Sequence, residues 1–113
     1  MDSRLPAHLE ISGLIRAVDA AGGFATLIAK GERDAGTILV VCCVNGLNSR
    51  LFERMPDADG ARKWTLVRSE NTENKQEFSD YLDRRRSQDR DLWIVELDIA
   101  EAERFIGSTG TRD

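Results

Sequence analysis

The sequence predicts an α+β domain, in which a mainly antiparallel sheet of about five strands packs against an N-terminal helix and a second helix. Three observations predict this class. Apolar residues recur at helical spacing near the start, a series of short apolar runs follows, and a polar helical segment precedes one last apolar run. Strands joined by short turns favour antiparallel pairing. The chain has the length of a single domain, expected over residues 1–113, with the order α-β-β-β-β-α-β-α.

The first helix is expected over residues 7–21. Pro6 suits a position at the start of a helix, and the Gly22-Gly23 pair suits its end. Apolar side chains occupy one face at the spacing i, i+3, i+4 and i+7, namely Ile11, Leu14, Ile15 and Val18.

Four strands are expected next, at residues 24–30, 37–44, 50–55 and 63–68. The second of these is almost continuously apolar and rich in β-branched residues, which indicates a strand buried on both faces. Asn45-Gly46 directly after it is a strong hairpin signal.

A second helix is expected over residues 75–88, where Asn74 and Glu77 have the spacing of a capping box. The last strand is expected at residues 92–97. Five of its six residues are apolar, which predicts a central position in the sheet, and its direction relative to its neighbours stays open.

A short helix is expected after the last strand. Asp98 and Glu101 have the spacing of a cap for this helix, which is expected to reach Ile106 and to end at Gly107. Residues 108–113 are expected to fray.

Composition and charge disfavour several classes of function. The chain has 16 basic and 20 acidic residues, and this net charge of −4 does not favour a nucleic-acid binder. No apolar run approaches the roughly 20 residues of a membrane helix, and the start lacks the pattern of a secretory signal. Cys42 and Cys43 are neighbours on a strand and point to opposite faces, which disfavours a disulfide. We therefore expect a cytoplasmic protein with reduced, buried cysteines.

Five segments, in order along the chain, carry a recognisable pattern: Arg4-Leu5 with Leu14-Ile15-Arg16, Gly22-Gly23-Phe24-Ala25, Lys30-Gly31 with Ala35-Gly36, Leu51-Phe52 with Trp64, and Arg84-Arg85-Arg86 with residues 89–96. On these residues the chain resembles a family of small bacterial proteins, the domain-of-unknown-function family 1491. The family's usual form has an acid where Glu32 stands and a proline where Arg90 stands. The resemblance implies a single small domain, found alone, without an established activity, and it adds no catalytic residue.

Basic residues near the first loop give one candidate site. Gly31 and Gly36 bound a loop that lacks the Lys-Ser/Thr pair and the following helix of a nucleotide P-loop, so a glycine-bounded turn is favoured. Lys30 and Arg33, together with Arg16, are candidates for a small anion-contacting loop, with ordinary solvated charge as the competing interpretation.

Acids around the last strand give a second candidate site. Glu96 and Asp98 are two residues apart and share a face, and with Asp91 they are candidate ligands for Mg²⁺ or Mn²⁺. The competing interpretation is a structural one, in which Asp98 caps a helix and Glu96 pairs with Arg16 or with an arginine of the 84–86 run.

Two further features are expected to be structural. Trp93 shares a face with Val95 and Leu97, so core packing is its default role, although it is kept as a binding candidate. The basic run at 84–86 is expected to be neutralised by acids at the spacings i, i+3 and i+4, namely Asp80 with Arg84 and Asp83 with Arg86.

The favoured function is that of a non-enzymatic interaction module that binds a protein partner or a second copy of itself through a sheet edge or a helix face. A small metal-dependent hydrolase or nuclease is one alternative, and a weak anion or nucleic-acid binder is another. No catalytic residue, metal ligand, cofactor or membrane contact is assigned. The binding candidates are Arg16, Lys30, Arg33, Trp93 and Glu96.

Overall fold

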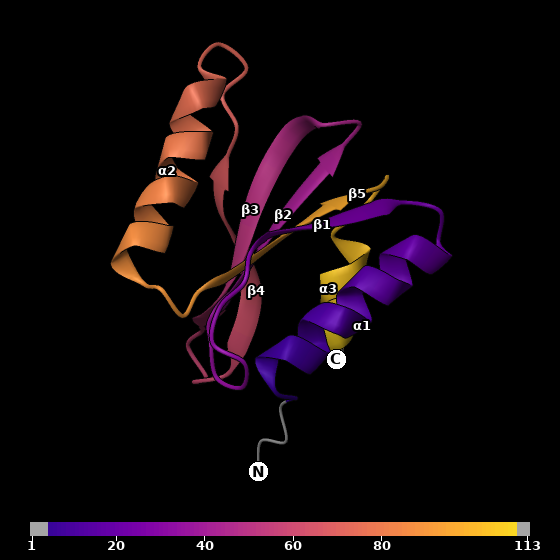
Figure 1. The fold of residues 1–113 in the computed structure, drawn as a ribbon, viewed down its shortest axis with the longest axis vertical. Helices are drawn as coiled ribbons and strands as arrows, with labels where there is room; N and C mark the ends of the chain where they lie inside the picture. The colour runs from indigo at the N-terminus through magenta and orange to yellow at the C-terminus, as the bar shows by residue number, and fades with distance from the viewer. Residues whose placement is uncertain (1–4, 111–113) are drawn as a thin grey trace.

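The computed structural model describes residues 5–110 of the chain, and the side chains of residues 5–107. The helices and strands follow the expected order (Figure 1): α1 Ala7–Ala20, β1 Phe24–Ala29, β2 Ile38–Val44, β3 Leu47–Pro56, β4 Arg62–Ser69, α2 Lys75–Gln88, β5 Trp93–Asp98 and α3 Arg104–Gly110. The strands form one five-stranded sheet, and three of its four pairings are antiparallel. The predicted α+β class and element order are therefore confirmed.

The strand order is β1-β5-β2-β3-β4. The last strand, β5, lies between β1 and β2, antiparallel to the first and parallel to the second. Of the first four strands, which were expected to pair in sequence through short turns, only β2, β3 and β4 follow one another in space, because β5 separates β1 from β2. The apolar character of β5 explains its place, since four of its six residues are buried and a central strand is covered on both sides.

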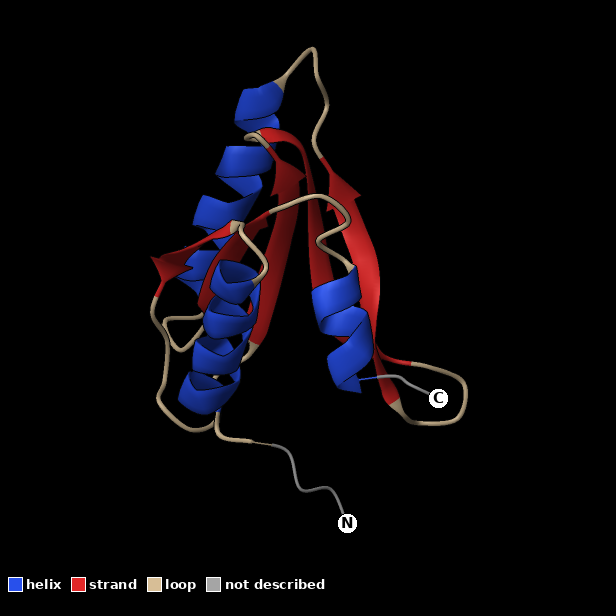
Figure 2. Ribbon diagram, turned by 90° about the vertical axis from the view of Figure 1, so that its right-hand side faces the viewer, coloured by secondary structure: helices blue, strands red, loops and turns tan. Residues whose placement is uncertain are grey.

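Helices cover both faces of the sheet. In Figure 2, α1 and α3 lie in front of the sheet and α2 lies behind it, and we call the two sides the α1 face and the α2 face. Alternate residues of β2 enter two separate cores: Ile38, Val40 and Cys42 on the α1 face, and Leu39 and Val41 on the α2 face. This alternation explains why the whole strand reads as apolar.

The predicted hairpin after β2 is confirmed, and β3 begins directly after it at Leu47. Asn45 and Gly46 have positive φ angles of 53° and 73°, the conformation that favours these residue types in tight hairpins. Asp98 stabilises this turn, because its carboxylate accepts hydrogen bonds from the amides of Asn45 at 2.7 Å and Gly46 at 3.0 Å.

The predicted caps are wrong, although α2 has the predicted bounds. The side chain of Asn74 makes no capping hydrogen bond within the described part of the chain. Asp98 does not cap α3, since that helix begins at Arg104 and Asp98 is occupied by the hairpin turn. The helix also continues past Gly107 to residue 110, where fraying was expected, and residues 111–113 lie outside the described residues.

Candidate functional site

Trp93 has a structural role in the core of the α1 face. Its side chain lies in the core of the α1 face with only 3% of the residue exposed, and its indole Nε1–H donates a hydrogen bond of 2.7 Å to the carbonyl of Glu32. The Glu32 amide in turn donates to the carbonyl of Asp91. Trp93 therefore fastens the loop of residues 31–36 to the start of β5, which leaves its ring without an accessible face for a ligand.

The structure does not bring the three basic loop candidates together. Arg33 forms an exposed pair with Asp34, with 3.4 Å between guanidinium and carboxylate. Arg16 is exposed on α1. Lys30 instead lines a separate hollow at the C-terminal end of α2, together with Arg86 and Arg90.

This hollow, the Lys30 hollow, has a volume of about 450 Å³ and is also lined by Asp83 and Asp89. Its basic residues have a structural explanation, because the C-terminal end of a helix carries a partial negative charge that stabilises nearby cations. The two acids further reduce its attraction for anions. The Lys30 hollow therefore gives little support to an anion site.

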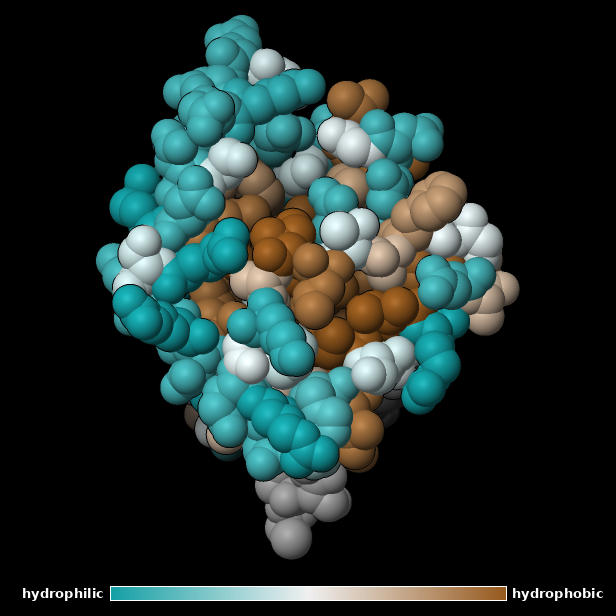
Figure 3. Space-filling model, in the orientation of Figure 1, coloured by the Kyte–Doolittle hydropathy of each residue, from teal (hydrophilic) through white to brown (hydrophobic). Residues whose placement is uncertain are grey.

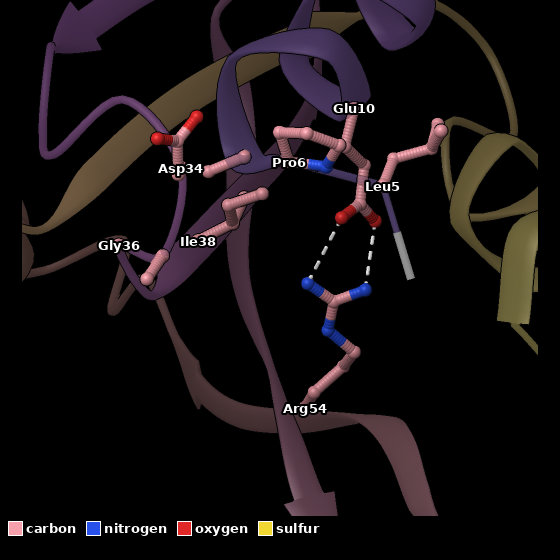
Figure 4. A pocket seen from close by; sticks show the side chains of 9 residues that line it. Leu5, Pro6, Glu10, Asp34, Gly36, Ile38 and Arg54 are labelled. Atoms are coloured by element: carbon pink, nitrogen blue, oxygen red, sulfur yellow. Dashed lines mark hydrogen bonds and ion pairs between the residues drawn. The ribbon is translucent and has the colours of Figure 1, made fainter. Parts of the chain in front are cut away.

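A second hollow lies beside the first turn of α1 and has a volume of about 380 Å³ (Figure 4). Glu10 and Arg54 face each other there and form a bidentate ion pair, with N···O distances of 2.7 and 3.1 Å. The guanidinium also stacks over Trp64, 4.6 Å from the ring centroid. Glu10 and Arg54 are already paired inside this hollow, and Asp34, which also lines it, pairs with Arg33, so the hollow serves to attach α1 to β3.

The arginine run does not use its predicted helical partners. Arg85 donates two hydrogen bonds to Glu53 of β3, at 2.9 and 3.0 Å, and this contact raises the pKa of Arg85 above its ordinary value. Arg84 lies over the ring of Tyr81, 5.8 Å from its centroid. Asp80 accepts a hydrogen bond from Gln76 instead. The prediction of self-neutralisation is wrong, because no described ion pair joins Asp80 to Arg84 or Asp83 to Arg86, and Asp80 and Arg84 contact other residues of α2.

Glu96 lines a third hollow, on the α2 face, and the predicted arginine partner is absent. Among residues 5–107, no ion pair joins Glu96 to a basic side chain, since Arg85 is taken by Glu53 and α1 lies on the opposite face of the sheet. Its polar neighbour is the thiol of Cys43 on β2. Glu96 is half-buried in this place, so its carboxylate loses part of its hydration without gaining a described ion pair.

The hollow around Glu96, which we call the Glu96 groove, has a volume of about 320 Å³. Strands β1, β2, β3 and β5 form its floor and α2 forms one wall. Its lining residues are Ile28, Val41, Ser49, Glu70, Lys75, Gln76, Phe78, Ser79, Leu82 and Glu96. In the orientation of Figure 1, Figure 3 shows apolar surface at the centre of the molecule, between α2 and α1.

The acids of the metal hypothesis do not converge. Asp91 precedes β5 while Asp98 ends it, so the two carboxylates lie at opposite ends of the strand. Asp98 is occupied by the hairpin amides. Among the described residues, no group of three or more His, Cys, Asp or Glu side chains is placed to hold a metal ion.

The two cysteines are free and buried, as the sequence predicts. Burial raises the pKa of the Cys42 thiol to about 12. Burial raises the pKa of the Cys43 thiol to about 12 as well, with a further contribution from the carboxylates of Glu96 and Asp98. At neutral pH both thiols are protonated, and neither has the thiolate character of a nucleophile.

Comparison with known proteins places these features in a family. The profile of the family described as "Protein of unknown function (DUF1491)" matches residues 5–107. The chain belongs to the DUF1491 family.

Solved structures of this family have the same fold. A crystal structure of a DUF1491 protein from Caulobacter crescentus CB15 has 31% sequence identity and a TM-score of 0.76, covering 90% of this chain and 94% of that one. The solution structure of protein Atu0922 from A. tumefaciens has 30% identity and a TM-score of 0.70, covering 91% and 92%. No protein with curated annotation shows significant similarity to this chain. Within the described residues of this DUF1491 chain, no helix is long and apolar enough to cross a membrane.

The free edge of β1 is a candidate binding surface of this DUF1491 chain. The sequence predicted binding through a sheet edge but did not indicate which residues form that edge. This strand, FATLIA, contains no charged residue, and its Phe24 and Leu27 are 75% and 39% exposed. The other edge strand, β4, carries three basic residues, Arg62, Lys63 and Arg68. The absence of charge in β1 was visible in the sequence, but its position at the edge depends on β5 taking the neighbouring place.

Proposed function

We propose that this chain is a self-associating interaction module in which two copies join edge to edge through β1. The observation that carries the proposal is the character of that edge. Natural proteins protect exposed edge strands with charges, prolines or bulges, because free backbone groups pair with other chains. β1 has no charge and no proline, its register shift lies near its end between Leu27 and Ala29, and it exposes three quarters of a phenylalanine.

Symmetry restricts the register of such a pair. A twofold axis perpendicular to the sheet brings together residues that point to the same face. We propose the register with the axis at Thr26, in which Phe24 lies opposite Ile28 of the second copy and Leu27 lies opposite Ala25. The shift in register between Leu27 and Ala29 marks the end of the paired segment. Burial of Phe24 against Ile28 supplies apolar contact to this arrangement.

The opposite edge supports the choice of β1. Two copies joined through β4 would bring Arg62, Lys63 and Arg68 of each strand toward the same residues of the other. Like charges on directly opposed strands are destabilising. A second copy is therefore accommodated better at β1 than at β4.

We further propose a cytoplasmic location, because two unpaired buried thiols suit a reducing compartment.

Size-exclusion chromatography with light scattering tests the proposal. We expect the wild-type chain to have twice the monomer mass of 12.6 kDa at high concentration. Leu27→Lys places a charge on the β1 edge and should give a monomer. Leu66→Lys is the matched control, since Leu66 is an exposed leucine of the β4 edge, and this variant should remain a dimer. A wild-type monomer, or loss of the dimer in the Leu66 variant alone, would contradict the proposal.

A further inference from the structure

The Glu96 groove has the composition of a small-molecule site. Ligand pockets in proteins have volumes from roughly 300 Å³ upward and combine apolar walls with a few polar groups. The groove has a volume of about 320 Å³, and Ile28, Val41, Phe78 and Leu82 form its apolar surface. The volume suits a short ligand rather than a folded partner.

The carboxylate of Glu96 has no basic partner among the described residues, and its polar neighbour is the thiol of Cys43. Across the sheet its neighbours are Thr26 of β1 and Val41 of β2, neither of which is basic. A half-buried carboxylate favours a cationic partner because burial removes part of its hydration. The thiol of Cys43 is a weak donor and supplies no positive charge.

The other charged residues of the groove do not neutralise Glu96. Glu70 is occupied at the far side, where its carboxylate accepts a 3.2 Å hydrogen bond from the amide of Ser49. Lys75 lies on the wall formed by α2 without an ion pair to any described acid, and it is exposed. The charges lining the groove are therefore two carboxylates and one ammonium group, with a net charge of −1.

We propose that the Glu96 groove binds a small alkylammonium ion. The ammonium group pairs with the carboxylate of Glu96, and the alkyl chain lies against the apolar surface formed by Ile28, Phe78 and Leu82. The residues of one copy line the whole groove, so this binding does not require the β1 dimer and each proposal can fail without the other, although Ile28 lines the groove and also faces Phe24 of the second copy in the proposed pair.

Titration of the full chain with n-hexylammonium, followed by ¹H–¹⁵N NMR, tests the inference. We expect saturable shifts at the amides of Ile28, Val41 and Phe78. n-Hexanol and n-hexanoate match the chain length without the positive charge, and they should bind at least about tenfold more weakly, as expected for loss of one charge-assisted hydrogen bond. Equal binding of the alcohol or the carboxylate, or no binding of the ammonium ion, would overturn the inference.

Three variants test which charged side chain binds the hexylammonium ion. Glu96→Gln keeps the size of the side chain and should weaken hexylammonium binding about tenfold. Lys75→Met removes an exposed like charge from the wall and should strengthen binding, and it tests the inference even where the Glu96 variant folds poorly. Glu73→Gln is the control, an exposed carboxylate outside the groove, and should leave binding unchanged. Unchanged binding in both groove variants would also overturn the inference.

Discussion

Adjacent residues on β3 attach helices to opposite faces of the sheet. Glu53 accepts the two hydrogen bonds of Arg85 on the α2 face, and Arg54 donates two to Glu10 on the α1 face. Successive side chains of a strand point to opposite faces, so two neighbours can reach two different helices. A bidentate arginine–carboxylate pair fixes orientation as well as distance. The two ion pairs therefore fix the position and orientation of α1 and α2 relative to β3.

Removal of one partner from a buried pair should be costly. In Arg54→Met, the carboxylate of Glu10, only 11% exposed, remains without its cation, and we expect a loss of about 3 kcal/mol in the free energy of unfolding. Urea denaturation measures it. Arg33→Met removes an arginine from an exposed pair with Asp34 and should cost less than about 1 kcal/mol. Equal losses in the two variants would contradict a structural role for the buried pair.

The buried thiols predict a dependence of stability on alkaline pH. The pKa of Cys42 is about 12 in the folded chain against an ordinary value of 9.0, so the folded state holds its proton where the unfolded state releases it. The contribution of this thiol to stability is complete below pH 9 and is lost as the pH rises from about 9 toward about 12. Chemical denaturation across this range should show the decline, with a smaller slope in Cys42→Ala. An identical slope in that variant would disprove the assignment.

Individual residues divide clearly between those that the sequence predicts and those that it does not. The free, buried cysteines followed from their adjacency on an apolar strand. The partners of Glu10 and Glu53 did not, because 44 and 32 residues separate them from their arginines and local spacing carries no trace of either pair. Glu96 was recognised as unusual from its position in an apolar strand, while the absence of an arginine partner required the fold.

Among the elements, the loop between β1 and β2 is held against the start of β5. A Cβ atom added at Gly31 or at Gly36 would collide with the carbonyl oxygen of Asp91, and one added at Gly36 would also lie 2.8 Å from the Trp93 ring. The close approach allows the Glu32 amide and the Trp93 indole to make their hydrogen bonds. Glycine is required here by contact rather than by a positive φ angle.

Alanine at either loop glycine should therefore destabilise the fold. A methyl group in Gly31→Ala meets a backbone carbonyl that cannot rotate away, and we expect a loss of roughly 3 kcal/mol or more. Gly13→Ala is the control, because its Cβ would meet nothing within 4 Å on α1 and should stabilise the helix by about 1 kcal/mol. Thermal unfolding distinguishes them: the melting temperature should fall in the first variant and rise in the second.

The positions of the helices along the chain were predicted more accurately than the side chains that cap them. Helix α2 has the predicted bounds because its polar and apolar residues recur at helical spacing. The caps failed because a carboxylate near a helix start has competing partners. Asp98 is 52 residues from Gly46 in sequence, yet the parallel pairing of β2 with β5 brings the hairpin amides to its oxygens. Such competition is decided by tertiary structure, which residue spacing does not contain.

At the scale of the whole molecule, the insertion of β5 determines which edge is free. The sequence predicted a central last strand, but it left the neighbours of that strand open. Once β5 lies between β1 and β2, the uncharged β1 becomes an edge and β4, with its basic residues, becomes the other. The candidate for self-association is thus a consequence of topology, which local patterns along the chain do not specify.

The proposed dimer has a signature in amide hydrogen exchange. In an edge strand, alternate amides point away from the sheet and exchange with solvent, and edge-to-edge pairing would bond them. At high protein concentration we expect slower exchange for outward amides of β1, while those of β4 exchange at an unchanged rate. Dilution should restore fast exchange, because association depends on concentration. In Leu27→Lys the amides of β1 should exchange fast at both concentrations. Protection that is independent of concentration would instead arise within one copy and would rule out this edge as the interface.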